Sequence, residues 1–129
     1  MGYDKDALIK YRKERSAESI QEAKLAIEND MLFNAENRIY YSIYYIVSAL
    51  AIKNNFSTSK HSQLLGWFNM NFVKKKVVST ELGKIYYSAF EKRQKGDYED
   101  LKYFTREEVN NDFLKMLEFV EFIEKLISE

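Results

Sequence analysis

The sequence predicts an all-α protein, an antiparallel up-and-down four-helix bundle with one additional short helix. The chain has 129 residues, no proline and four glycines, so residues that break helices or form tight turns are rare. Apolar residues recur every three or four positions along most of it, which is the spacing of one buried helix face. The alternation that is typical of strands is absent. The length fits one domain, residues 1–129.

Two long helices are expected in the first half of the chain. The first covers residues 4–27. Its inner face is formed by Ile20, Ala23 and Ile27. The second covers residues 34–53, where Asn34 is a suitable N-cap. Its inner face is formed by Ile39, Ile43, Ile46, Val47 and Leu50. Because this segment carries the fewest charges of the expected long helices, we expect it to be the central helix.

Three further helices complete the predicted bundle. A short one covers residues 62–72, with Leu64, Leu65, Trp67 and Phe68 partly buried. The fourth begins at Ser79 or the residue after it and ends at Gly96, which follows basic residues in the last turn. Thr105 and Glu108 form a capping box that opens the last helix. Its buried face consists of Val109, Phe113, Leu117, Val120, Ile123 and Ile127.

The composition excludes several classes of site. Twenty basic and twenty acidic residues cancel, so net charge gives no general attraction to nucleic acid. The chain has one histidine and no cysteine, which excludes disulfides, the usual zinc sites and the Glu-x-x-His pairs of di-iron bundles. There is no glycine-rich phosphate loop. We therefore predict neither a metal nor a cofactor.

The location of the protein is also predicted from the sequence. No run of about 18 apolar residues is present, so we expect no membrane association. Residues 1–6 carry charges of both signs and lead into no apolar stretch, so we expect no secretory signal. The resulting prediction is a cytoplasmic protein.

Asn37 and Arg38 form the first candidate site, in the first turn of the second expected helix and close to Tyr40 and Tyr41. A cation is unfavourable at the N-terminus of a helix, so Arg38 should have a compensating partner. That partner is either a carboxylate or carbonyl group at a helix junction, or an anion bound by the backbone N–H groups of the helix start.

His61 and the segment from Arg93 to Tyr98 are the other candidates. His61 is the one side chain that titrates near neutral pH without perturbation. It either bonds backbone or water at a helix start, or contacts phosphate or transfers protons in a cleft. Arg93 precedes Asp97 by four residues. The two form an ion pair that fixes the loop beneath Tyr98, or they contact phosphate or nucleic acid.

Tyrosines are concentrated on two of the expected helices. Tyr40 with Tyr44, and Tyr41 with Tyr45, are four residues apart and should stack along one helix. Tyr86 and Tyr87 lie on the fourth helix. Core packing is the simplest interpretation, while tyrosines that face outward would indicate a dimer surface.

Taken together, four segments of the chain resemble the HEPN family of small all-α domains. They are residues 35–42 (Ala-Glu-Asn-Arg-Ile-Tyr-Tyr-Ser), 60–62 (Lys-His-Ser), 68–73 and 93–98. The resemblance covers most of the chain. It implies a bundle of about five helices, a homodimer, and pairing with a minimal nucleotidyltransferase in a two-gene toxin–antitoxin module.

Many HEPN proteins are metal-independent ribonucleases whose signature is an arginine followed, after four to six residues, by a histidine in a dimer cleft. Arg93 has Tyr98 at the first of these positions, and no arginine of the chain has a histidine there. We therefore predict binding of a nucleotide, RNA or a nucleotidyltransferase, with weak cleavage or none. The predicted site consists of Asn37, Arg38, Tyr41, His61, Arg93, Asp97 and Tyr98. The alternatives are a ribonuclease that uses Arg93 with His61 or Tyr98, and a purely structural bundle.

Overall fold

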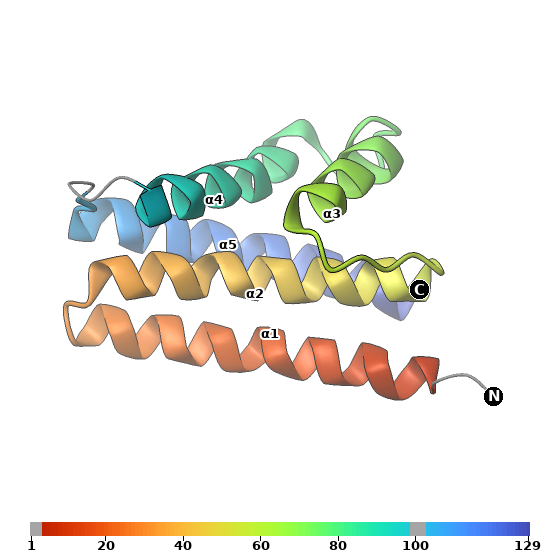
Figure 1. Cartoon of the computed structure of the whole chain (residues 1–129), viewed down its shortest axis with the longest axis horizontal. Coiled ribbons are helices and arrows are strands. Elements are labelled where there is room, and N and C mark those ends of the chain that lie inside the picture. Colours follow the sequence, from red (N-terminus) through yellow and green to blue (C-terminus); the bar gives the residue numbers. More distant parts are fainter. Residues whose placement is uncertain (1–3, 99–102) are drawn as a thin grey trace.

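A computed structural model of the chain describes residues 4–98 and 103–129, except for the side chains of residues 96–98. The elements are α1 (Lys5–Glu28), α2 (Leu32–Lys53), α3 (His61–Phe68), the π-helical turn η1 (Asn69–Val73), α4 (Thr80–Tyr98) and α5 (Arg106–Ser128). Consecutive long helices run in opposite directions, and α3 with η1 lies in the connection from α2 to α4 (Figure 1). The predicted all-α bundle with one short additional helix is confirmed.

The central element is α2, as the sequence predicts. It packs against α1, α3, α4 and α5, and it lies between α1 and the pair formed by α4 and α5 (Figure 1). The five apolar residues predicted for its inner face are all buried, namely Ile39, Ile43, Ile46, Val47 and Leu50. This helix therefore touches every other α-helix and positions whatever polar groups it carries. No helix within the described ranges is long and apolar enough to span a bilayer.

The predicted N-cap of α2 is wrong. The helix begins at Leu32, and its N-cap Met31 makes no side-chain capping bond. The reason lies in the preceding turn, where Asp30 adopts a φ of 59° and the Met31 amide donates to the Ala26 carbonyl at 2.8 Å. This tight C-terminal turn of α1 leads directly into α2. As a consequence, Asn37 and Arg38 lie in the second turn of α2 and not at its start.

The predicted ends of the other long helices are partly correct. Ser79 Oγ accepts the Leu82 amide at 3.1 Å, and Thr105 Oγ1 accepts the Glu108 amide at 3.0 Å, so both predicted helix starts are confirmed. The predicted stop at Gly96 is wrong, because α4 continues to Tyr98. A glycine weakens a helix by about 1 kcal/mol but does not terminate it by itself.

Two details of packing also differ from prediction. On α5, Val109, Val120, Ile123 and Ile127 are buried as predicted, but Leu117 is 37% exposed, and Met116 and Phe119 fill the inner face in its place. The predicted short helix ends in the π-helical turn η1, which packs closely on α4. A Cβ at Gly83 would lie 2.9 Å from a methyl carbon of Val73, so a glycine at this position permits the close approach.

Candidate functional site

Two polar clusters are built on α2, and both include residues from other helices. The first, called the arginine–tyrosine cluster, consists of Arg12, Arg15, Arg38, Tyr40, Tyr41, Tyr44, Tyr45, His61 and Arg93. The second, called the carboxylate–lysine cluster, consists of Glu36, Lys92, Glu108 and Asp112. Both are held by side chains that α2 presents to different neighbours.

The tyrosines of α2 form the predicted ladder. Tyr40 and Tyr44 stack with ring centroids 6.1 Å apart, and Tyr41 and Tyr45 lie 5.9 Å apart. Tyr40 and Tyr44 are buried, whereas Tyr41 and Tyr45 are half-buried. The core interpretation therefore holds for the first pair, and the second pair keeps part of its ring surface open to solvent. Tyr87 on α4 is 49% exposed, and its role in a dimer surface stays a prediction.

His61 is the first residue of α3 and lies against this ladder. Its ring stacks on Tyr44 with centroids 4.2 Å apart and an interplanar angle of 10°. Its Nδ1 is 2.7 Å from the hydroxyl of Tyr40, a side-chain partner that the sequence did not predict. The predicted bond to backbone or water and the predicted contact with phosphate both stay predictions. Burial, and secondarily the charge of Arg93, lower the pKa of His61. The imidazole is therefore neutral at pH 7.

Arg93 reaches the same rings from α4. Its guanidinium carbon lies 5.3 Å from the ring centroid of Tyr40 and 5.6 Å from that of Tyr41. His61 also contacts both rings, so residues from α3 and α4 meet on one surface of α2. The two other predicted members, Asp97 and Tyr98, have side chains outside the described residues, and their roles stay predictions.

Arg38 and Asn37 form a local unit at one end of the ladder. Arg38 lies 4.8 Å from the ring centroid of Tyr41, and it donates to Asn37 Oδ1 at 3.1 Å from Nε and 2.7 Å from Nη2. It also forms an ion pair with Glu22 at 3.2 Å. The predicted carboxylate partner is thus confirmed. The interpretation as an anion site at a helix N-terminus is wrong, because these residues lie in the second turn.

Arg12 and Arg15 on α1 join the cluster, and sequence reasoning missed them. Arg15 donates to the hydroxyl of Tyr45 at 3.2 Å and lies 5.1 Å from its ring centroid. Arg12 hydrogen-bonds Tyr44 and favours its ionised form, although burial keeps the pKa of Tyr44 above its usual value. The signal was present: Arg12 precedes Ser16 by one helical turn, and Ser16 is buried against the Ser42 carbonyl at 2.7 Å. The inner face of α1 therefore extends back to Arg12.

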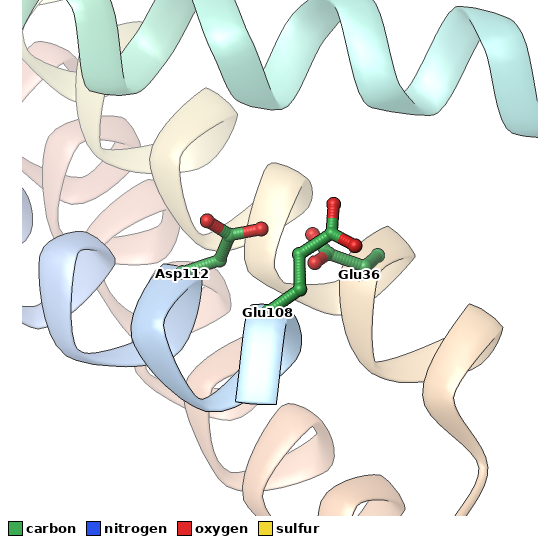
Figure 2. A group of neighbouring side chains, drawn as sticks. All are labelled: Glu36, Glu108 and Asp112. Atoms are coloured by element: carbon green, nitrogen blue, oxygen red, sulfur yellow. The ribbon is translucent and has the colours of Figure 1, made fainter. Parts of the chain in front are cut away.

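The carboxylate–lysine cluster was not predicted either. Glu36 is only 5% exposed, and its carboxylate faces those of Glu108 and Asp112 from α5 (Figure 2). One oxygen from each lies within 4.8 Å of the others. Burial, together with the hydrogen bond to Asp112, raises the pKa of Glu36 to about 9. Glu36 is therefore protonated at pH 7 and donates to Asp112.

Lys92 from α4 supplies the cation of this cluster. Its Nζ lies 3.0 Å from Glu108 and also hydrogen-bonds Asp112. Burial alone would lower the pKa of Lys92, but these hydrogen bonds raise it. The carboxylates offer oxygen atoms of the kind that hard cations prefer. In this arrangement, however, the proton on Glu36 and the ammonium group of Lys92 already offset two of the three carboxylate charges, which indicates a structural role.

A pocket of about 410 Å³ adjoins the carboxylate–lysine cluster between α2, α4 and α5. Its apolar lining includes Ile39, Ile43, Ile85 and Ala89. Glu36 precedes Ile39 by three residues and Ile43 by seven, so it occupies the buried stripe of α2. An acid at such a position is the sequence signal that could have revealed this cluster.

Comparisons with known proteins agree with the fold described above. Residues 9–126 match the family described as HEPN domain. The chain is 44% identical over 126 residues to a UPF0332 protein of Thermotoga maritima, covering 98% of this chain and 96% of the relative. Two relatives from Methanocaldococcus jannaschii are provisionally named toxins. One is 29% identical, covering 90% of this chain and 86% of the relative. The other is 32% identical, covering 70% and 66%.

Proposed function

The chain belongs to the HEPN domain family, and we propose that it is an RNA-binding member whose arginine–tyrosine cluster holds a single strand. Guanidinium groups would contact the phosphates, and the half-buried rings of Tyr41 and Tyr45 would stack with bases. Arginine suits this role because its planar donors match phosphate oxygens in pairs.

The observation that carries this proposal is the convergence of cationic side chains from separate helices on one ladder of rings. Arg15 comes from α1, Arg38 from α2 and Arg93 from α4, and each lies over a tyrosine ring at 4.8–5.6 Å. Basic groups interleaved with aromatic rings are the usual surface for single-stranded nucleic acid. The whole chain has a net charge of zero, so the support for RNA binding comes from the local concentration of arginines at the tyrosine ladder.

The ion pairs within the cluster are of a kind that RNA can replace. Arg15 pairs with Glu18, and Arg38 pairs with Glu22, whose side chains are 60% and 54% exposed. Pairs with such an exposed partner contribute little, because water and salt screen them. Breaking these ion pairs so that phosphates can take the place of the carboxylates therefore costs little free energy.

The biological setting we propose is a toxin–antitoxin module. It is supported by the two relatives that are provisionally named toxins and by the HEPN membership. Within such a module the protein would act as a homodimer and would pair with a minimal nucleotidyltransferase. Co-expression with the product of the adjacent gene, followed by size-exclusion chromatography with light scattering, tests both associations. A monomer that elutes apart from that product would contradict them.

RNA binding is tested by fluorescence anisotropy with labelled single-stranded RNA of mixed sequence. We expect Arg93→Gln to weaken binding roughly tenfold or more, because a charge-assisted hydrogen bond is lost. Lys95→Gln is the matched control. It removes the same charge from the same helix, at a position that is exposed. Equal affinities for wild type and Arg93→Gln would contradict the proposal, as would equal losses in the two variants.

A second candidate function is metal-independent RNA cleavage at the same cluster. It is favoured by the contact of His61 and Arg93 with the same two rings, which brings an acid–base group near an arginine. Cleavage of end-labelled RNA in the presence of EDTA tests it. If cleavage occurs, His61→Ala should reduce its rate roughly 10²–10⁴-fold. Binding without cleavage by the wild type would reject this function and leave the first intact.

A further inference from the structure

We propose that Tyr40 is a positioning residue that fixes the proton of His61 on Nε2, so that His61 donates a hydrogen bond to an RNA phosphate oxygen. The inference rests on the proposed RNA-binding function for the identity of the acceptor. The placement of the proton rests on the structure of the protein alone.

The first step concerns the hydroxyl of Tyr40. The residue is fully buried, and its hydroxyl lies 2.7 Å from Nδ1 of His61. Within the described ranges, that nitrogen is the one hydrogen-bond partner of the hydroxyl. If Nδ1 carried a proton, it would donate to the phenol, and the phenolic proton would be buried without an acceptor. Burying a donor without an acceptor costs about 1–3 kcal/mol in folding free energy. The phenol therefore donates and Nδ1 accepts.

The second step follows from the chemistry of imidazole. A neutral ring carries one proton, so a ring that accepts at Nδ1 bears that proton on Nε2. Burial of Tyr40 raises the pKa of its phenol, which keeps the donor protonated. Tyr41 and Tyr44 from α2 and Arg93 from α4 face the ring of His61. No carboxylate is among these groups, and burial together with the charge of Arg93 disfavours the imidazolium.

The third step concerns orientation. The ring of His61 is stacked on Tyr44 at 4.2 Å and contacted by Tyr41 edge-on at 5.8 Å. These contacts, together with the bond at Nδ1, hold the plane of the ring. His61 is half-buried, and in the described part of the chain no hydrogen bond occupies Nε2. A fixed N–H group beside Arg93 suits an anionic oxygen acceptor, and a phosphate is the anion that RNA supplies.

This placement separates His61 from a general base. A base must accept a proton at the nitrogen that faces the substrate, and Nε2 of this tautomer already bears one. The same ring can still donate to a phosphate. The inference therefore predicts that the contribution of His61 is to binding, and that an uncharged N–H donor at the same place can substitute for it.

The proton position can be measured because the chain has a single histidine. Long-range ¹H–¹⁵N spectra of the wild type at pH 7 should show a protonated Nε2 and an unprotonated Nδ1. Tyr40→Phe should shift the ring towards a mixture of both tautomers and raise the pKa of His61. Tyr86→Phe is the matched control, since it removes another fully buried phenol hydroxyl, and it should leave the spectrum unchanged. A proton on Nδ1, or identical spectra for wild type and Tyr40→Phe, would overturn the inference without any RNA present.

The acceptor is tested with two substitutions of His61. Glutamine places an amide N–H close to the position of Nε2, whereas alanine removes the donor. In anisotropy titrations with single-stranded RNA, His61→Ala should weaken binding roughly tenfold, and His61→Gln should recover most of that loss. Equal losses in the two variants would reject the donor role. If wild-type protein binds no RNA, the RNA-binding function fails, and the spectra still decide the position of the proton.

Discussion

Lys92 and Arg93 are adjacent on α4, yet they belong to different clusters. Successive residues on a helix point about 100° apart, so Lys92 meets the carboxylates of α5 while Arg93 meets the tyrosines of α2. In the carboxylate–lysine cluster, Lys92 is shared by Glu108 and Asp112, and Glu36 retains its proton. In the arginine–tyrosine cluster the cations lie on ring faces, and the carboxylates of Glu18 and Glu22 stand at an exposed edge.

This difference indicates which cluster can accept a ligand. Bringing a metal ion into the carboxylate–lysine cluster would require displacement of Lys92 or of the proton on Glu36, and each of them already hydrogen-bonds Asp112. A cation on a tyrosine face gains roughly 0.5–2 kcal/mol, and the carboxylates that pair with Arg15 and Arg38 are exposed enough for an anion to replace them. The two clusters therefore suit stability and binding, respectively. Each of the following predictions tests that division.

Removal of the lysine charge should have the largest effect on stability. Lys92→Met leaves Glu108 and Asp112 facing each other without a cation, beside the carboxyl of Glu36. Since Lys92 is 22% exposed, we expect a loss of roughly 2–4 kcal/mol in the free energy of unfolding. Urea denaturation followed by circular dichroism measures it. RNA affinity of the folded variant should stay at the wild-type value.

Lys84→Met is the control for this substitution, since Lys84 lies exposed on the same helix and lines the same pocket. Its unfolding free energy should change by less than about 0.5 kcal/mol. If Lys92→Met weakened RNA binding while leaving stability intact, the roles assigned to the two clusters would be reversed.

Replacement of the buried acid should stabilise the protein. The pKa of Glu36 is about 9 in the folded state and about 4.3 in an unfolded chain. Between these values only the folded state holds the proton, so the free energy of unfolding falls as pH rises through this window and is constant outside it. Glu36→Gln mimics the protonated acid and can still donate to Asp112. We expect a gain on the order of 2 kcal/mol near pH 7.

The pH dependence distinguishes this gain from a general effect of substitution. Thermal or urea unfolding between pH 5 and pH 9 should show that the advantage of Glu36→Gln grows with pH. A constant difference across this range would mean that Glu36 does not retain its proton on folding. Glu118→Gln serves as a control, since Glu118 lines the same pocket but is exposed.

Charge removal in the arginine–tyrosine cluster should appear in the salt dependence of RNA binding. For single-stranded nucleic acid, the slope of log affinity against log salt changes by about 0.7 for each phosphate contact. Arg38→Gln should reduce the slope by about this amount and lower affinity by a factor of several, with stability nearly unchanged. Anisotropy titrations over a range of salt concentrations measure it. An unaltered slope would show that Arg38 serves only its ion pair with Glu22.

Much of the fold was predictable because it depends on periodic apolar residues. The inner face of α2 and the caps at Ser79 and Thr105 follow from local sequence rules. The start of α2 did not, because the turn at Asp30 closes the C-terminus of α1 with backbone hydrogen bonds and leads directly into α2, so the helix begins before Asn34. Local patterns do not reveal such a substitution.

The candidate site was predicted in part, for a related reason. The tyrosine ladder, Arg38 and His61 could be identified from spacing and from their rarity in the chain. Arg12 and Glu36 were missed, although each lies on the buried face of its helix, because their partners on other helices could not be identified from the sequence. The meeting of His61 with Arg93 likewise depends on how α3 and α4 approach α2, which sequence spacing does not determine.

The smallest predicted effect compares two buried phenols. The hydroxyl of Tyr40 bonds His61, whereas that of Tyr86 has no hydrogen-bond partner within the described part of the chain. Tyr40→Phe leaves Nδ1 of His61 without its donor and should destabilise the protein by roughly 1–2 kcal/mol. Tyr86→Phe removes a hydroxyl that gained no hydrogen bond on burial. The unfolding free energy of this variant should therefore equal that of the wild type or exceed it by less than about 1 kcal/mol. Urea denaturation of the two variants, side by side, measures this difference. If Tyr86→Phe proved the more destabilising, the polar network would extend into the core between α4 and α5, and the boundary drawn between the two clusters would have to move.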